Sequence, residues 1–347
     1  MSEEIRALID ALCRDHALEQ ADYGRLIEGY SPETAAYLAQ RADEARRQVY
    51  GNSVYLRGLI EISNICKNDC LYCGIRRSNA QCGRYRLTMA DILDCCRQGD
   101  ALGFRTFVLQ GGEDGALTDE WLCDVVGQIK RLYPDCAVTL SVGERSRESY
   151  QRLYDAGADR YLLRHETADA AHYARLHPQA MSFENRMRCL RDLREIGYQV
   201  GCGFMVGSPY QTTKELACDL KFIERFRPDM CGIGPFIPHS ATPFSSFAAG
   251  TAQMTCYLLS IIRLICPGVL LPATTALGVI APGGQEMGIR SGANVVMPNL
   301  TIESMRKKYD LYAGKTGAQS ARETESICRR IKEIGYEVVS SRGDVQR

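Results

Sequence analysis

The sequence has no excess of charge of either sign, since 42 lysines and arginines balance 42 aspartates and glutamates among its 347 residues. Proteins that bind nucleic acids or membrane surfaces through charge usually carry a basic patch. The balanced charge therefore supports neither class. With 45% apolar and 24% charged residues, the composition is that of an ordinary globular protein.

The sequence also lacks a long hydrophobic run near its start, where MSEEIRALIDALCRDHALEQ mixes acidic and basic residues. A signal peptide or a membrane-spanning helix needs an apolar core, so we expect a cytoplasmic protein. Without an export signal, the 16 cysteines are not expected to form a disulfide framework. Most of them, such as Cys136 and Cys202, lie in apolar segments where free cysteine packs like a small hydrophobic residue.

No proline- or serine-rich linker divides the chain, which favours a single α/β domain. Residues 1–50 show helical spacing and predict an N-terminal helical extension. Residues 51–315 alternate strand-like and helix-like runs, which predicts a single (β/α)8 TIM barrel rather than two flavodoxin-like domains. Residues 316–347 are expected to form a short C-terminal α/β tail that packs on the barrel. The predicted strands are 54–63, 104–112, 137–143, 159–166, 199–207, 229–236, 269–275 and 293–299.

Three cysteines with the spacing C-x3-C-x2-C directly follow the first predicted strand: Cys66, Cys70 and Cys73, with Tyr72 before the last. Loops after barrel strands build active sites. Three thiolates there could bind zinc with a water, or a [4Fe–4S] cluster in which one iron lacks a protein ligand. Catalytic zinc more often uses histidine or carboxylate beside cysteine, and the spacing favours the cluster over zinc or a chance group of structural thiols.

This cysteine motif resembles that of the radical S-adenosylmethionine (SAM) superfamily. In that family the open iron binds the amino and carboxylate groups of SAM, and reductive cleavage yields methionine and a 5′-deoxyadenosyl radical. The resemblance implies an enzyme in which cluster and SAM carry the chemistry while the barrel positions the radical. Gln110, Gly111, Gly112 and Glu113, after the second predicted strand, resemble the GGE motif that holds the methionine amino group. Alone, two glycines after a strand indicate only a tight turn.

Further segments resemble the HydE family of [FeFe]-hydrogenase maturases, and the resemblance runs from about residue 50 to residue 315. Biotin synthase and methylornithine synthase share the barrel and the cysteine loop. The segments that carry the resemblance are 159–168, 182–186, 232–239, 271–278 and 292–299.

The resemblance assigns Glu166 to the ribose hydroxyls of SAM and Arg186 to its carboxylate, although surface ion pairs are the alternative for both. The assignment is chemically sound, because a carboxylate accepts hydrogen bonds from hydroxyls and a guanidinium binds a carboxylate with two donors. Tyr72 and the GGE residues complete the implied SAM site. The residues that match the substrate-cavity positions of the family are Arg164, Gln110, Thr274, Thr275, Met297, Tyr309 and Tyr312.

Some members of this family carry a second cluster near the C-terminus on cysteines spaced C-x7-C-x2-C. The matching stretch here keeps only Cys328, with Gly317 and Glu325 at the other two places. A lone cysteine cannot hold a cluster, so we expect a single [4Fe–4S] cluster. His165 and His239 also lie at strand ends, but they lack ligand-like spacing and a structural role is favoured for both.

By this resemblance the chain is a radical SAM enzyme of H-cluster maturation. The implied substrate is a small iron–cysteine–carbonyl–cyanide precursor of the diiron subcluster, attacked at its cysteine sulfur. HydG would supply it, HydF would receive the product, and a flavodoxin or ferredoxin would donate electrons. The alternatives are a radical SAM mutase acting on an amino acid, like methylornithine synthase, and a non-catalytic metal-binding or cluster-carrier protein.

Overall fold

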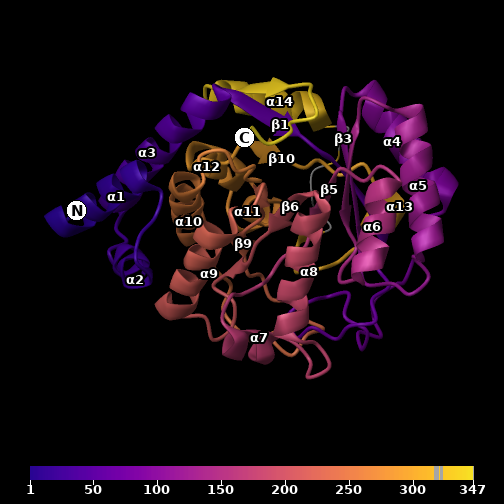
Figure 1. Ribbon diagram of the computed structural model, residues 1–347, viewed down its shortest axis with the longest axis horizontal. Coiled ribbons are helices and arrows are strands. Elements are labelled where there is room, and N and C mark those ends of the chain that lie inside the picture. The colour runs from indigo at the N-terminus through magenta and orange to yellow at the C-terminus, as the bar shows by residue number, and fades with distance from the viewer. Residues whose placement is uncertain (316–319, 321–322, 347) are drawn as a thin grey trace.

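A computed structural model describes residues 1–315, 320 and 323–346 of the chain. Its first part consists of three helices, α1 (Glu3–Asp15), α2 (Gln20–Glu28) and α3 (Pro32–Tyr50). Ser2 and Ser31 cap α1 and α3 because their side chains accept hydrogen bonds from free backbone N–H groups of the first turn. The three helices lie along one side of the molecule, where α3 packs against α10 (Ala252–Ile265) and α2 against α9 (Thr213–Phe226) (Figure 1).

Parallel strands close into a barrel. Six of them pair in the order β2-β3-β4-β5-β6-β8. Single bridges from Met230 to Leu270 and from Pro272 to Val295 extend the sheet to β10, and a bridge between Leu59 and Asn299 joins it back to β2. The predicted (β/α)8 barrel is therefore confirmed. The bounds are β2 (Gly58–Ser63), β3 (Thr106–Gly111), β4 (Ala137–Ser141), β5 (Arg160–Leu162), β6 (Gln199–Cys202), β8 (Met230–Cys231) and β10 (Val295–Val296).

Helices cover the outside of this barrel (Figure 1). Six of them coincide with segments whose amphipathic spacing predicts a helix, namely α4, α5, α6, α8, α9 and α10. The bounds of the helices are α4 (Met89–Ala101), α5 (Asp119–Leu132), α6 (Arg147–Asp155), α7 (Ala170–Leu176), α8 (Phe183–Ile196), α9 (Thr213–Phe226), α10 (Ala252–Ile265), α11 (Thr275–Ile280), α12 (Gly284–Arg290), α13 (Glu303–Arg306) and α14 (Thr324–Glu333).

The seventh predicted strand is shorter than its sequence suggests. Only Leu270 and Pro272 make bridges, and Thr274 is already the N-cap residue of α11. Pro272 has no N–H group to donate to a sheet, and α11 begins at Thr275 without a side-chain hydrogen bond from its N-cap residue. Thr274 and Thr275 therefore lie at a strand-to-helix junction rather than at the end of a strand.

The C-terminal part returns to the start of the barrel. β1 (Ser53–Leu56) precedes β2 and pairs in parallel with both β10 and β11 (Glu337–Val339). A separate two-stranded pair joins β7 (Met205–Val206) to β9 (Gly234–Pro235). In the expected tail, residues 316–319, 321, 322 and 347 lie outside the described residues. The described part of this tail consists mainly of α14, β11 and residues 340–346.

Apolar side chains from strands and helices form one large core around the barrel wall. Cys136 and Cys202 are buried in that core, and all 16 cysteines are free thiols. The core packing expected for Cys136 and Cys202 is therefore confirmed. Within the described residues, no helix combines the length and the apolar character that crossing a membrane requires.

Candidate active site

The three cysteines lie in the loop after β2, at the mouth of the barrel, and line a cavity of about 350 Å³. Backbone hydrogen bonds anchor this loop: Lys67 N–H donates to the carbonyl of Glu113 (2.9 Å), and Leu71 N–H donates to the carbonyl of Leu176 (3.0 Å). Arg84 donates to the carbonyls of Asn64 (2.7 Å) and Ile75 (2.8 Å). The loop is therefore held at both ends before any ligand binds.

Burial raises the pKa of all three thiols, and that of Cys73 reaches about 12. Mutual repulsion adds to the effect, because the charges of Cys73 and Cys66 further raise the pKa of Cys70. Thiolates packed this way need a cationic centre to compensate them. No three His, Cys, Asp or Glu side chains of the described chain converge closely enough to hold one metal ion. This separation gives no support to zinc, whereas cysteines that ligate a cluster bind separate irons.

The loop after β3 approaches the cysteine loop very closely. A Cβ atom on Gly112 would lie 2.3 Å from the carbonyl oxygen of Ile65 and 2.8 Å from the Cβ atom of Cys66. Only glycine fits there, so the predicted GGE segment has a packing reason for its second glycine. Glu113 lies against Gly143, in the loop after β4, and its Oε1 accepts a hydrogen bond from Glu144 N–H (3.0 Å).

Charged groups at the ends of β4 and β5 form the opposite wall. Arg186 on α8 donates from Nε to Glu144 Oε1 (2.5 Å) and from Nη1 to the carbonyl of Arg164 (2.6 Å). Burial acts to lower the pKa of Arg186, but the negative charges around it, including that of Glu144, raise it overall. Arg186 therefore stays a cation, and its Nη2 makes no hydrogen bond that the described structure contains.

Arg164 and Glu166 form an ion pair with Nη2 and Oε2 3.2 Å apart. The pair does not satisfy either group, because Arg164 Nε and Nη2 and Glu166 Oε2 lack a well-aligned hydrogen bond although they are buried. Glu166 also has a φ of 64°, a left-handed conformation that is uncommon outside glycine. Backbone strain and unsatisfied buried groups together are typical of a ligand site.

Deeper in the barrel, Gln110 Nε2 lies 3.4 Å from the hydroxyl of Tyr309. The hydroxyl of Thr274 is buried without a hydrogen-bond partner in the part of the chain that the structure describes. A buried ion pair joins Lys315 Nζ to Glu61 Oε1 (2.6 Å) beside them. The cavity is lined by all the residues predicted for the site: Cys66, Cys70, Tyr72, Cys73, Gln110, Gly111, Gly112, Glu113, Arg164, Glu166, Arg186, Thr274, Thr275, Met297, Tyr309 and Tyr312.

Arg57 forms part of the cavity floor and was not predicted as a site residue. It is buried, donates from Nη1 to the sulfur of Met230 (2.9 Å), and has no partner for Nε or Nη2 within the described structure. Burial lowers its pKa well below the usual value. The signal in the sequence was an arginine inside the apolar run VYLRGLIEIS.

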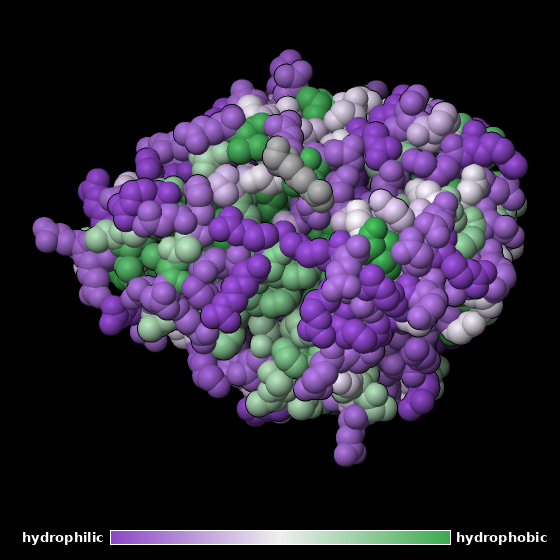
Figure 2. All heavy atoms as spheres, in the orientation of Figure 1, coloured by the Kyte–Doolittle hydropathy of each residue, from purple (hydrophilic) through white to green (hydrophobic). Residues whose placement is uncertain are grey.

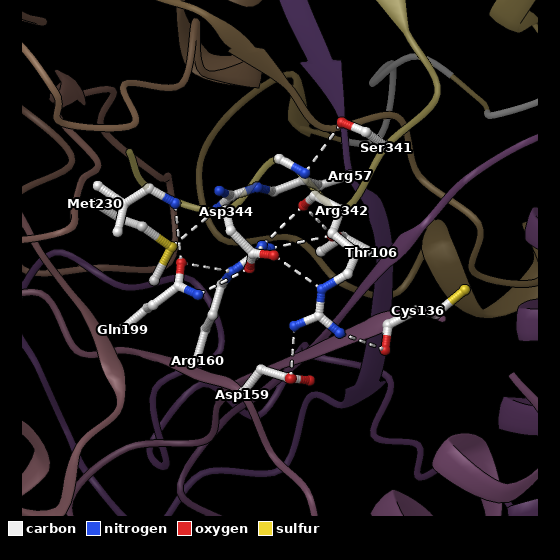
Figure 3. Close-up of polar contacts among 12 residues, drawn as sticks. Arg57, Thr106, Cys136, Asp159, Arg160, Gln199, Met230, Ser341, Arg342 and Asp344 are labelled. Carbon is white, nitrogen blue, oxygen red and sulfur yellow. Dashed lines mark hydrogen bonds and ion pairs between the residues drawn. The ribbon is translucent and has the colours of Figure 1, made fainter. Parts of the chain in front are cut away.

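Below this floor, the C-terminal segment closes the bottom of the barrel (Figure 3). Asp344 Oδ1 pairs with the buried Arg160 (2.6 Å), and Arg342 pairs with Asp159 (2.8 Å). Arg160 also donates to the hydroxyl of Thr106 (3.1 Å), so the strand ends and the tail share one polar network.

Glu144, Lys315 and Met181 are further residues at this site that the sequence did not reveal. Lys315 and Met181 line the cavity, and Met181 Sδ lies 3.6 Å from Cys70 Sγ. Glu144 acts from just outside by holding Arg186. None of the three belongs to a recognisable local motif, because their contacts join segments that are distant in the sequence.

Neither of the two histidines at predicted strand ends is among the described residues that line the cavity. His165 Nε2 lies 3.2 Å from Asp219 Oδ1, and burial lowers its pKa to about 3. His239 Nε2 lies 3.0 Å from Asp310 Oδ2, behind the cysteine loop. Their surroundings are consistent with the structural role expected for both.

Of the three positions that match a second cluster, Glu325 and Cys328 lie on α14, whereas Gly317 lies outside the described residues. Cys328 is half-buried and free. The expectation of a single cluster stays a prediction.

The donor set around the cavity fits a cluster with SAM. Three thiols of one loop could ligate three irons, and unsatisfied charges of both signs could bind a zwitterionic ligand. These features come from different strands and meet at one place.

Comparisons with known proteins agree with this geometry. Residues 60–223 match the family model of the radical SAM superfamily. The chain is 47% identical over 278 residues to the [FeFe] hydrogenase maturase subunit HydE of Thermotoga maritima, which covers 80% of this chain and 79% of that protein. It is 27% identical to 3-methylornithine synthase of Methanosarcina barkeri, over 96% of this chain and 94% of that protein.

Among solved structures, the fold is similar to methylornithine synthase (PylB), with a TM-score of 0.84 and 26% identity. The similarity covers 96% of this chain and 97% of that chain. The level of identity to the Thermotoga protein, together with the superfamily match, decides the family. The chain belongs to the radical SAM superfamily and, within it, to the family of the [FeFe] hydrogenase maturase subunit HydE.

Proposed function

We propose that this chain is an [FeFe]-hydrogenase maturase that cleaves SAM reductively during assembly of the H-cluster. The observation that carries the proposal is the convergence of three cysteines and several unsatisfied buried charges on one cavity inside the barrel. The 47% identity to a hydrogenase maturase over most of both chains supports the same function.

In this proposal Cys66, Cys70 and Cys73 hold one [4Fe–4S] cluster and leave one iron open. Bound together, the cluster and SAM supply a 5′-deoxyadenosyl radical once an electron arrives. The chain's own residues bind and orient SAM: Arg186 receives its carboxylate and Glu166 its ribose hydroxyls. The backbone of Gly111, Gly112 and Glu113 receives the amino group, and Tyr72 packs beside the ligand.

The remaining cavity residues would bind the substrate. Arg164 offers buried donors, and the hydroxyl of Thr274 is unpaired in the described structure, so a small anionic ligand would satisfy both. A cavity of about 350 Å³ admits a small molecule and excludes a macromolecule. We propose that it takes an iron–cysteine–carbonyl–cyanide precursor made by HydG, and that HydF receives the product. The substrate residues would be Arg164, Thr274, Thr275, Met297, Tyr309 and Tyr312.

A radical SAM mutase acting on an amino acid is the second candidate, and it is favoured by the fold similarity to methylornithine synthase. The lower identity to that enzyme, 27% against 47%, ranks it second. An assay for methylornithine with amino acids as substrates separates the two. Formation of methylornithine would favour the mutase, and its absence together with hydrogenase activation would favour the maturase.

The test of the shared chemistry is anaerobic reconstitution followed by dithionite and SAM. We expect about four irons per chain and formation of 5′-deoxyadenosine. Cys70→Ala should lose both, whereas Cys82→Ala, a nearby cysteine that does not line the cavity, should keep both. Four irons without any 5′-deoxyadenosine would instead indicate a cluster carrier. The proposal also includes a cytoplasmic location and a single cluster. About eight irons per chain would contradict the single cluster.

A further inference from the structure

A second hollow lies on the outer surface between α8 and α9, with a volume of about 450 Å³. Among the described residues, it shares no lining side chain with the active-site cavity. Figure 2 shows hydrophobic surface between α9 and α8, with hydrophilic surface on both sides. We call this hollow the α8–α9 groove. Its large apolar lining side chains are Phe183, Met187, Leu190, Phe222 and Phe226.

The charges along the α8–α9 groove are all positive. Arg191 on α8 and Arg225 on α9 are exposed and line it, and neither forms an ion pair that the described structure contains. The third cation, Lys221, is already paired with Glu224 (2.6 Å). No aspartate or glutamate is among the described lining residues. Two free guanidinium groups around an apolar slot favour an acidic protein partner.

The α8–α9 groove connects to the cysteine loop through packed aromatic rings. Phe183 contacts Tyr173 edge-on with ring centroids 5.7 Å apart, and Tyr173 stacks on His177 at 3.9 Å. His177 Nε2 lies 3.2 Å from the hydroxyl of Tyr72, the residue directly before Cys73.

A second link joins the groove to the cysteine loop through the backbone. Met181, which contacts Cys70, is two residues before Phe183. Tyr173 and His177 are buried, so the first link runs through closely packed protein, whereas the second follows the covalent chain. Electron tunnelling falls steeply with distance and is faster through bonded and packed atoms than across gaps. The α8–α9 groove is thus a surface site with a continuous packed connection to the cluster ligands.

We propose that the α8–α9 groove docks an acidic one-electron carrier protein and is the place where electrons enter the enzyme. This inference rests on the proposed function, because each SAM cleaved needs one electron. The carrier is oxidised by one electron and the cluster site is reduced by one, and no bond or proton is exchanged between the proteins. The small apolar area suits a transient encounter, in which charge sets the association rate.

Charge reversal of the two free arginines tests the docking directly. The double variant Arg191→Glu and Arg225→Glu should bind purified flavodoxin about tenfold more weakly than the wild type, and the remaining binding should depend less on salt. The matched control is Arg131→Glu with Arg329→Glu, which makes the same charge change at exposed sites on α5 and α14. Calorimetric titration of the reconstituted proteins at low and moderate salt provides the dissociation constants.

The second readout is the rate of 5′-deoxyadenosine formation with two reductants. With reduced flavodoxin the groove variant should be about tenfold slower than the control, whereas with dithionite, which needs no docking site, the two should be equal. The proposal would be overturned if the groove variant and the control bound flavodoxin equally well and formed 5′-deoxyadenosine at equal rates. It would also be overturned if the groove variant were slowed as much with dithionite as with flavodoxin. Failure of the wild type with dithionite would count against the proposed function instead, and the titration would still decide the docking.

Discussion

Arg186, to which we assign the carboxylate of SAM, is held in place by a residue that does not line the cavity. Two of its three nitrogens are taken by Glu144 and by the carbonyl of Arg164, which leaves Nη2 for the cavity. A guanidinium fixed in this way loses little side-chain entropy when it binds a carboxylate. Glu144 is thus a positioning residue in our account.

Glu144→Gln should therefore weaken SAM binding without removing any atom that touches SAM. We expect a dissociation constant about tenfold higher, since the charge-assisted hydrogen bond that fixes Arg186 becomes a neutral one. Equilibrium dialysis with reconstituted protein measures this constant, and Glu148→Gln, at an exposed site on α6, is the control. Unchanged affinity in Glu144→Gln would contradict the positioning role.

Two buried histidines predict how stability depends on pH. Burial lowers the pKa of His165 and of His177 from 6.5 to about 3, so both are neutral in the folded protein near pH 7. In the unfolded chain they bind protons below pH 6.5, which favours unfolding as the pH falls from that value towards 3. We expect the free energy of unfolding to drop by about 2 kcal/mol per histidine between pH 7 and pH 5.

Urea denaturation of the protein at these two pH values measures the drop. His177→Gln should show a smaller decrease than the wild type, because it removes one of the two titrating groups. Stability that is equal at both pH values would mean that these imidazoles are accessible to protons in the folded state.

At the residue scale, sequence and structure agree wherever a motif carries the chemistry. The cysteine spacing, the GGE segment and the positions that resemble the family's SAM and substrate residues all line the cavity, although their roles remain predictions. Glu144 and Lys315 could not be predicted, because their importance arises from partners far away in the sequence, whereas Arg57 stood out only as a charged residue inside an apolar run. Lys315, for example, pairs with Glu61 across 254 positions.

Among the elements, the C-terminal segment closes the bottom of the barrel beneath Arg57 (Figure 3). The contact depends on Asp344, which faces the fully buried Arg160. Burial acts to raise the pKa of Asp344, but hydrogen bonds from Arg342 and Gln199 and the charge of Arg160 hold it below 3.8. This carboxylate therefore stabilises the fold above pH 3.8 and loses that contribution as the pH falls further.

Asp344→Asn should lower the free energy of unfolding at pH 7 by about 1 to 2 kcal/mol, because it leaves a buried guanidinium without its counter-charge. The value is less than for a fully buried pair, since Asp344 is 41% exposed and solvent screens it. Asp135→Asn, at an exposed site just before β4, is the control, and chemical denaturation is the measurement. If both variants were equally stable, the ion pair between Asp344 and Arg160 would make no contribution to the free energy of unfolding.

The elements that the sequence failed to predict are short. α7, α11 and α12 have seven residues or fewer, too few for a helical pattern to stand out from its neighbours. The prediction of a strand up to residue 275 was wrong for a related reason. β-branched residues suggested a strand, but the helix α11 begins at Thr275.

For the whole molecule, the regular alternation of strands and helices was enough to predict a barrel, because right-handed parallel crossovers leave few other arrangements. The sequence could not show how the barrel closes. Closure depends on isolated bridges, such as Leu59 to Asn299, between segments with no distinctive pattern. It also could not show the α8–α9 groove, whose two walls come from different helices.

The most direct measurement of the central claim is activation of an [FeFe]-hydrogenase in vitro. Anaerobic mixtures would contain the apo-hydrogenase, HydG, HydF and a reductant, with this chain absent, present, or present as Cys70→Ala. Our account predicts that hydrogen evolution appears with the wild-type chain and stays at the level of the mixture without it when Cys70 is replaced. Equal activation by the wild type and by Cys70→Ala would contradict a function based on the three-cysteine loop.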